Sequence, residues 1–314
     1  KLMMTIFINY ELSCPYKGEL NDQTISVIHE EDKALKTDWT GWYYISKESR
    51  ELTKMRIRNN YKSKYDSEKI SALHFAVENE DVDIIKLLIN RPEIDINKKL
   101  IRYYQSQVSS FSMNDDKREE KTSLHIAVEK GNLEIVKLLC SNENININDK
   151  TMDAYPSTDD ARERKTPIHI AIENNNYEIV EFLLKLPKIK INLISTYEKW
   201  WNGGKEEYEE KTPLNFAAET GNLEIFKILL SHPNIRVNKE LIEFYTMQNL
   251  LWLYKRKETS LLIAIDKKHY EIVKLLLENK KTDINALSIL EYRALKYKRK
   301  KQFKTPLFLA VENE

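Results

Sequence analysis

Three histidines recur at one position of a repeated segment, and they are the first candidates for chemistry. His74, His125 and His169 each stand fourth in segments of the type Thr-Ser-Leu-His-Ile-Ala-Val. A zinc ion holds imidazole nitrogens at about 2 Å, whereas packed helices lie about 10 Å apart. Histidines one repeat apart therefore cannot share an ion, and we expect no metal site. The other histidines have no cysteine or carboxylate at ligand spacing: His29, His232 and His269.

The sequence also lacks the motifs of catalysis. It has no nucleophile elbow, no Cys–His pair and no Walker-type phosphate loop. Its six glycines leave little room for loops that bind phosphate. We therefore expect a protein without enzymatic activity and without a cofactor. One group of carboxylates is typical of a solvated surface: Glu206, Glu207, Glu209 and Glu210.

Aromatic and basic residues gather instead in long segments between the repeats. Tyr, Trp and Arg dominate the binding energy of protein interfaces, so these residues are candidates for contacts with a protein partner. Most of the aromatic side chains should pack within the protein, because isolated hairpins are marginal in water. Trp200, Trp201 and Trp252 are the strongest candidates for partner contacts. The full set is Tyr103, Tyr104, Tyr197, Trp200, Trp201, Phe244, Tyr245, Trp252, Tyr254, Tyr297, Lys298, Arg299, Lys300 and Lys301.

A basic run lies in the last of these segments. Seven Lys and Arg residues stand against one Glu between Ala286 and Lys304, and residues 298–301 are the densest part. Such a run is usually a solvated face, but it could also steer an acidic protein partner such as tubulin. Binding of nucleic acid is the weaker interpretation, because the basic residues do not form a stripe along the chain.

Helical hairpins must hold these segments in place. Thr122 has the hydroxyl of an N-cap, and the apolar residues after it recur at helical spacing. Gly131 can adopt the left-handed conformation that ends a helix. Residues 133–139 then predict a second amphipathic helix. The result is a helix–turn–helix unit whose apolar sides are too large to be buried within one unit.

The unit recurs along the chain, with openers 44 to 51 residues apart. Gly221 fills the turn of a second copy, whereas other turns contain Asn79-Glu80, Asn175-Asn176 or Lys268-His269. Asn tolerates the left-handed conformation, so we expect the Lys268-His269 turn to be the most strained. The openers begin at Ser71, Thr122, Thr166, Thr212, Thr259 and Thr305.

These residues resemble the ankyrin repeat. The likeness rests on Thr-Pro-Leu-His-x-Ala openers, on second helices such as Asn-Leu-Glu-Ile-Val-Lys-Leu-Leu, and on Ile-x-Ile-Asn ends such as residues 145–148. It extends from Ser71 to the C-terminus. Heavy use of Lys, Asn, Ile and Tyr makes the chain most like the expanded ankyrin families of unicellular eukaryotes with AT-rich genomes.

The resemblance carries expectations about fold and function. It implies an all-α solenoid of helix–turn–helix units with extended fingers, some of them β-hairpins. It also implies that His74, His125 and His169 form structural hydrogen bonds between neighbouring repeats. Recognition of a folded protein partner through the fingers and first helices is the function that it implies.

The repeats exceed the roughly 33 residues of the family, and the extra residues lie in the fingers. Insertions on one face of a solenoid usually mark its binding face. Residues 202–204, Asn-Gly-Gly, predict a hairpin turn in the third finger. The fourth and fifth fingers have few turn residues, so strands and short helices both remain open there. The fingers span residues 98–121, 149–165, 193–211, 239–258 and 286–304.

We divide the chain into two parts. Residues 1–70 form an N-terminal segment or a degenerate capping repeat, and residues 71–314 form five near-complete repeats and a truncated sixth. The sixth copy stops within its first helix, which leaves Leu307, Ala310 and Val311 without a cover. We therefore expect the sequence to be part of a longer chain.

Composition bounds the class of protein. With 41% hydrophobic residues, 32% charged residues and a net charge of +1, the 314-residue chain is expected to fold. Two distant cysteines, Cys14 and Cys140, fit a reducing compartment such as the cytoplasm. No apolar run reaches the roughly 18 residues of a membrane span. We expect a protein-binding scaffold, with a cytoskeletal or axonemal assembly as one setting. The alternative is a targeting or regulatory module of a larger enzyme or channel.

Overall fold

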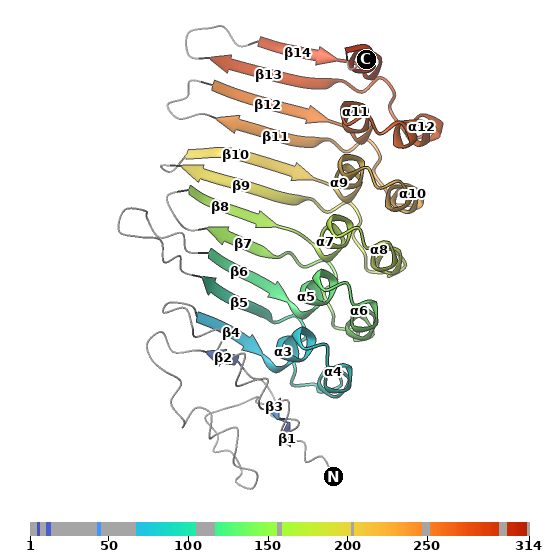
Figure 1. Ribbon diagram of the computed structural model, residues 1–314. Helices are drawn as coiled ribbons and strands as arrows, with labels where there is room; N and C mark the ends of the chain where they lie inside the picture. The colour runs from blue at the N-terminus through green and yellow to red at the C-terminus, as the bar shows by residue number, and fades with distance from the viewer. Residues whose placement is uncertain are drawn as a thin grey trace. The chain divides into compact units, whose positions relative to one another are not determined.

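The computed structural model describes residues 5–6, 11–13, 43–44, 67–104, 117–155, 159–201, 204–246, 252–294 and 300–312. The predictions for the N-terminal segment fall largely outside these residues, as do Tyr297, Lys298 and Arg299. The chain divides into two compact units. One comprises Lys1–Asn146 with Tyr155–Ser157, and the other comprises Ile147–Ala154 with Thr158–Glu314. In each unit, helical hairpins alternate with pairs of strands (Figure 1).

The described part of the first unit contains two helical hairpins. Strands β2, β4, β5 and β6 pair in that order, and β1 pairs with β3. The pairs whose register is known are antiparallel. The helices are α3 (Ala72–Glu78), α4 (Val82–Ile89), α5 (Ser123–Glu129) and α6 (Leu133–Cys140). The strands are β1 (Thr5–Ile6), β2 (Glu11–Ser13), β3 (Tyr43–Tyr44), β4 (Ser67–Ser71), β5 (Lys99–Tyr104) and β6 (Lys117–Thr122).

The second unit repeats the pattern three times and adds a final helix. Its helices are α7 (Pro167–Glu173), α8 (Tyr177–Leu184), α9 (Pro213–Thr220), α10 (Leu223–Ser231), α11 (Ser260–Asp266), α12 (Tyr270–Glu278) and α13 (Pro306–Glu312). Its strands are β7 (Met152–Tyr155), β8 (Asp159–Arg164), β9 (Ser195–Trp201), β10 (Gly204–Lys211), β11 (Leu241–Thr246), β12 (Trp252–Glu258), β13 (Ser288–Ala294) and β14 (Lys300–Lys304).

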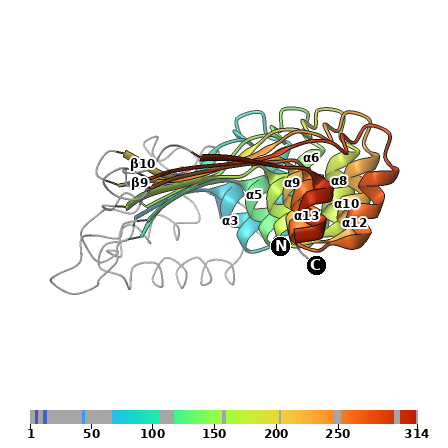
Figure 2. The same cartoon turned by 90° about the horizontal axis from the view of Figure 1, so that it is seen from above.

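The fingers of the second unit form one sheet. Strands β7 to β14 are neighbours in chain order, and successive fingers pair with each other through β8–β9, β10–β11 and β12–β13. Figure 2 shows the strands extending away from the helices, with the first helices α9 and α13 nearer to them than α10 and α12. The fourth and fifth fingers are strands, which decides between the two conformations left open by the sequence.

The expectation of an all-α fold is therefore wrong, although the helical repeats are present. Each finger leaves backbone N–H and C=O groups along both of its edges, and such groups need partners when they leave water. A single two-stranded hairpin is marginal in water. Pairing with the next finger satisfies the edge groups and stabilises both hairpins, so the long fingers become a sheet.

The helix ends follow from particular side chains. Thr122, Thr166, Thr212 and Thr259 are the N-caps of the first helices α5, α7, α9 and α11. The turn before each second helix has a residue with positive φ, at 72° for Gly131 and 75° for Gly221. Lys268 adopts 58° in the same position, but Glu80 adopts 57° and Asn175 adopts 56°. The Lys268 turn is thus no more distorted in φ than the others.

The core of each repeat lies between its two helices. In α5 and α6, the side chains of Leu124, Val128, Ile135 and Leu139 have no exposed surface. Burying each such side chain stabilises the fold by about 1.5–3 kcal/mol. The last helix differs, since Leu307 is 76% exposed and Val311 is 64% exposed.

Candidate functional site

One face of the second unit's sheet is turned toward the first helices. Lys211 ends β10, and its Nζ lies 2.6 Å from Oε2 of Glu219 in the last turn of α9. Side chains alternate between faces along a strand, so the strand register identifies the other residues on this side. We call it the inner face. It includes Glu163, Lys165, Ser195, Tyr197, Lys199, Glu207, Glu209, Lys211, Glu243, Tyr245, Tyr254, Arg256 and Glu258.

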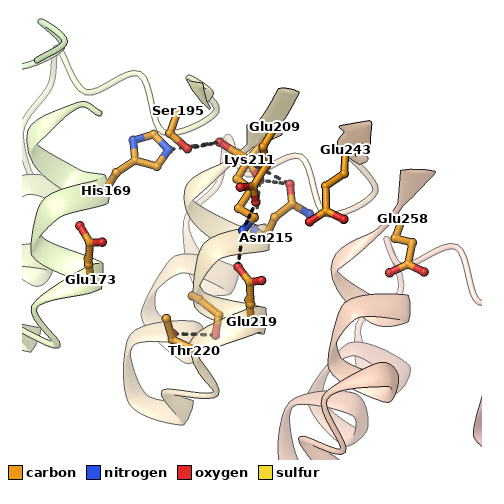
Figure 3. A network of polar contacts seen from close by, with 12 residues as sticks. His169, Glu173, Ser195, Glu209, Lys211, Asn215, Glu219, Thr220, Glu243 and Glu258 are labelled. Carbon is orange, nitrogen blue, oxygen red and sulfur yellow. Dashed lines mark hydrogen bonds and ion pairs between the residues drawn. The ribbon is translucent and has the colours of Figure 1, made fainter. Parts of the chain in front are cut away.

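A lysine at the base of most fingers joins the last strand of the finger to the first helix that follows it. Lys211 pairs with Glu209 on its own strand and with Glu219 on α9 (Figure 3). Lys165 lies 2.8 Å from both Glu163 and Glu173. Burial opposes the charged form of Lys165, but its hydrogen bonds to these two carboxylates outweigh burial and raise its pKa. In the first unit, Lys121 is 2.9 Å from Glu129 and 3.9 Å from Glu119.

The next repeat reverses the charges at this place. Glu258 replaces the lysine, and Arg256 supplies the cation. The Arg256 guanidinium pairs with Glu258, with Asp266 at 3.0 Å and with Glu243 at 3.9 Å. Ser288 Oγ donates a 2.8 Å hydrogen bond to Glu258. Burial disfavours the charged guanidinium, yet these carboxylates raise the pKa of Arg256 overall.

Sequence reasoning missed these pairs, although a signal exists. A lysine directly precedes the opener, and a glutamate follows it eight residues later. This spacing recurs in Lys121/Glu129, Lys165/Glu173, Lys211/Glu219 and Lys304/Glu312. The pairs become visible only when the charges of one copy are aligned with those of the next, whereas the predictions above rest on aromatic residues and on isolated charges.

The recurring histidines are buried and make hydrogen bonds within the fold. Nδ1 of His74 lies 2.6 Å from Ser71 Oγ, and its Nε2 lies 3.1 Å from the backbone nitrogen of Leu100. Nδ1 of His169 lies 2.7 Å from Thr166 Oγ1, and its Nε2 is 3.3 Å from the carbonyl oxygen of Lys211, which precedes the next opener. Each imidazole thus joins an N-cap to a later part of the chain.

Burial lowers the pKa of both histidines. The pKa of His74 falls to about 3, although the backbone carbonyls of Lys98 and Lys121 partly oppose the change. The pKa of His169 also falls to about 3, with the Lys211 carbonyl in opposition. His125 is fully buried and lies 2.7 Å from Thr122 Oγ1. His74 and His169 are therefore neutral near pH 7, which suits hydrogen bonding and not charge-based binding.

Asparagines in the Ile-x-Ile-Asn ends connect neighbouring repeats. Asn192 donates to the carbonyl of Asn234 at 2.7 Å, and its Oδ1 accepts from the backbone N–H of Arg236 at 2.9 Å. Asn97, Asn148 and Asn238 make the same pair of hydrogen bonds to the repeat that follows each of them. These residues help to identify the repeat in the sequence, but their hydrogen bonds were not predicted from it.

The aromatic candidates divide between the two faces of the sheet. Tyr245 and Tyr254 lie on the inner face with ring centroids 5.8 Å apart. Phe244 lies on the opposite face and stacks on Tyr208 at 5.3 Å. Tyr197 is on the inner face, and Trp200 is on the opposite face. Both are half-buried.

For some of the other predicted residues the structure gives the position in a strand, and for Lys300 and Lys301 it also gives the exposure of the side chain. Tyr103 and Tyr104 end β5, Trp201 ends β9 and Trp252 begins β12. Lys300 and Lys301 are exposed in β14, where Lys301 lies 3.8 Å from Glu291. Among the candidates of the second unit whose side chains the structure describes, Tyr245 and Tyr254 make a ring contact on the inner face, whereas Phe244 and Trp200 lie on the opposite face.

In the part of the chain that the structure describes, no three His, Cys, Asp or Glu side chains come close enough to hold a metal ion. None of the helices found there has the length and apolar character needed to span a bilayer.

Comparison with known proteins identifies the repeats. No curated protein matches the chain. A family model described as ankyrin repeats (3 copies) matches residues 42–151, 98–195, 157–240 and 193–288. These overlapping matches cover well over half of the sequence and include the Asn, His and Thr positions described above. The chain belongs to the ankyrin-repeat family.

Proposed function

We propose that the protein is a non-enzymatic interaction module that binds a protein partner through the inner face of its fingers and the adjoining first helices. Ankyrin repeats are in general protein-binding modules. The observation that carries the proposal is the fixed attachment of each finger to its helix, as in the contacts of Lys211 with Glu209 and Glu219. Pre-ordered strands lose little entropy on binding.

We also propose the chemistry of the partner and the setting in which the protein acts. An acidic protein surface, such as that of tubulin, suits the basic fifth finger, where Lys300 and Lys301 are exposed. This would place the protein in a cytoskeletal assembly of the cytoplasm. The alternative is a targeting or regulatory module of a larger enzyme or channel. Both alternatives use the same binding face, so the first experiment should locate that face.

Photo-crosslinking tests the proposal directly. A photoreactive amino acid replaces Lys199 or Gln302, which lie on the inner face, or Lys227 on the second helix α10 as the matched control. After irradiation in extract of the native cell, mass spectrometry identifies the adducts. We expect the same protein to be attached at both inner-face positions and not at Lys227. Adducts from Lys227 without any from the inner face would overturn the proposal.

A further inference from the structure

The inner face carries an exposed aromatic pair beside carboxylates. Tyr245 is 45% exposed, and its ring plane makes an angle of 43° with that of Tyr254. Glu207 is the register partner of Tyr245 on the neighbouring strand. Glu243 precedes Tyr245 by two residues and therefore lies on the same face. We call these four residues the tyrosine shelf.

Negative charge is in excess around the shelf. Lys211 meets two carboxylates, and Arg256 meets three, those of Glu243, Glu258 and Asp266. Each cation therefore leaves at least one carboxylate uncompensated. Among the described side chains, the cation nearest to Glu207 is that of Lys199 at 4.0 Å, and a third of the Glu207 side chain is exposed.

The pKa of Glu243 is raised mainly by burial, and charges of both signs act on it as well. Burial raises its pKa, Arg256 and Lys211 lower it, and the charges of Glu219 and Glu258 raise it again, with a raised pKa as the result. The charges of Glu243 and Glu207 also contribute to the raised pKa of the Tyr245 phenol, whose main cause is burial. The carboxylates of Glu243 and Glu207 thus act on the exposed ring of Tyr245, and among the described side chains Arg256 opposes them only in part.

We propose that the tyrosine shelf binds an arginine side chain of the protein partner. A guanidinium stacks on the faces of aromatic rings and donates several hydrogen bonds in one plane. The shelf offers Tyr245 and Tyr254 for stacking, and Glu207 and Glu243 as acceptors. This inference rests on the proposed function, because it specifies the chemistry of the partner at the same face. An acidic segment would be repelled here, so the shelf and the basic fifth finger select opposite charges.

The probe is the dipeptide N-acetyl-Arg-Arg-amide, added to the intact protein at low salt. Tyrosine ring signals are followed by NMR, with Tyr245→Phe used to assign the signal of Tyr245. We expect saturable shifts at Tyr245 and Tyr254. Tyr245→Ala should weaken the affinity about fivefold, as the loss of one cation–π contact implies. The double variant Glu207→Gln, Glu243→Gln keeps the shape of the shelf and should weaken the affinity for the dipeptide about tenfold.

The opposite face supplies the matched control. There Tyr208 of β10 stacks on Phe244 of β11, and these two strands also carry Glu207, Glu243 and Tyr245 of the shelf. Tyr208→Ala should leave the affinity for the dipeptide unchanged. The proposal would be overturned by an absence of saturable shifts at Tyr245, by equal shifts from the neutral citrulline dipeptide, or by undiminished binding to the double variant.

The two proposals can fail separately. Inner-face crosslinks to a partner, without arginine binding at Tyr245, would overturn the proposal for the tyrosine shelf and leave the proposed function intact. Arginine binding at Tyr245, without any inner-face crosslink in extract, would support the shelf chemistry and overturn the proposed function.

Discussion

Buried neutral histidines make the stability of the repeats depend on pH. His74 and His169 have a pKa of about 3 in the folded protein, because burial disfavours the imidazolium ion. In the unfolded chain a histidine takes up its proton near pH 6.5. Between these values the unfolded state binds more protons, so stability is lost as the pH falls from about 6.5 toward 3.

His169→Asn should reduce this pH dependence. Lowering the pH from 7 to 5 should cost about 2 kcal/mol of stability for each such histidine. In the variant, the loss of stability between these pH values should be smaller by this amount. Asparagine is compatible with the position, since Asn215 occupies it in the next repeat and bonds to Thr212 and to the carbonyl of Lys239. Denaturant unfolding at both pH values measures the difference. An unchanged pH effect in the variant would contradict this account of His169.

Two N-cap threonines should differ in how much they contribute to the stability of the fold. Thr122 Oγ1 lies 2.7 Å from Nδ1 of His125 and accepts a hydrogen bond from the His125 backbone N–H. Thr259 is also buried, but Leu262 replaces the histidine, and Thr259 Oγ1 has no hydrogen-bond partner among the described residues.

Thr122→Val should therefore cost about 1 kcal/mol of stability. Thr259→Val should be close to neutral, because it removes a hydroxyl that already lacks a partner. Thermal unfolding of the two variants side by side gives the comparison. Equal losses would show that the imidazole does not determine the value of the cap.

At the scale of elements, the Asn192 amide connects one repeat to the next. Asn192→Ala removes the bonds to Asn234 and Arg236. The expected loss is about 1 kcal/mol, since both bonds are near the surface. Asn285 is the matched control, because it is exposed and its side-chain amide makes no such bond within the described residues. Asn285→Ala should leave the denaturation midpoint unchanged, and a similar loss from both variants would contradict the connecting role.

Local signals in the sequence predicted the helical elements well. Thr122 caps the helix that follows it directly, and Gly131 adopts the positive φ of the turn in which it lies. Both effects are local, so the cap and the turn could be predicted from residue type. The pairing of successive fingers could not be read in this way. It depends on contacts between strands more than 30 residues apart in some pairs, such as Tyr208 with Phe244, and no local pattern specifies them.

The composition of the candidate site was predicted in part, and its geometry was not. Tyr245, Tyr254 and Phe244 were all candidates, but the sequence did not show that Phe244 faces away from the other two. A register shift of one residue exchanges the faces of a strand. Register here is fixed by pairing on both sides of β11, with β10 and β12, and residue types along a single strand do not specify that pairing.

At the scale of the whole molecule, repetition converts weak local contacts into an ordered surface. Most repeats contribute a Lys–Glu contact at the finger base, an asparagine connection to the next repeat and a buried N-cap. Such terms add along a repeat protein, because each unit contacts its neighbours in the same way. Within the second unit the outcome is a continuous sheet whose inner face presents Tyr245 with an excess of carboxylates nearby.

Hydrogen–deuterium exchange of the intact, unbound protein tests most directly whether the fingers are ordered before binding. The account predicts that amides of strands β9 to β12 exchange slowly, at rates comparable with those of helices α9 and α10. Each of these strands has a hydrogen-bonded neighbour along both of its edges. Exchange of these strands at the rate of an unstructured peptide, while the helices remain protected, would contradict it.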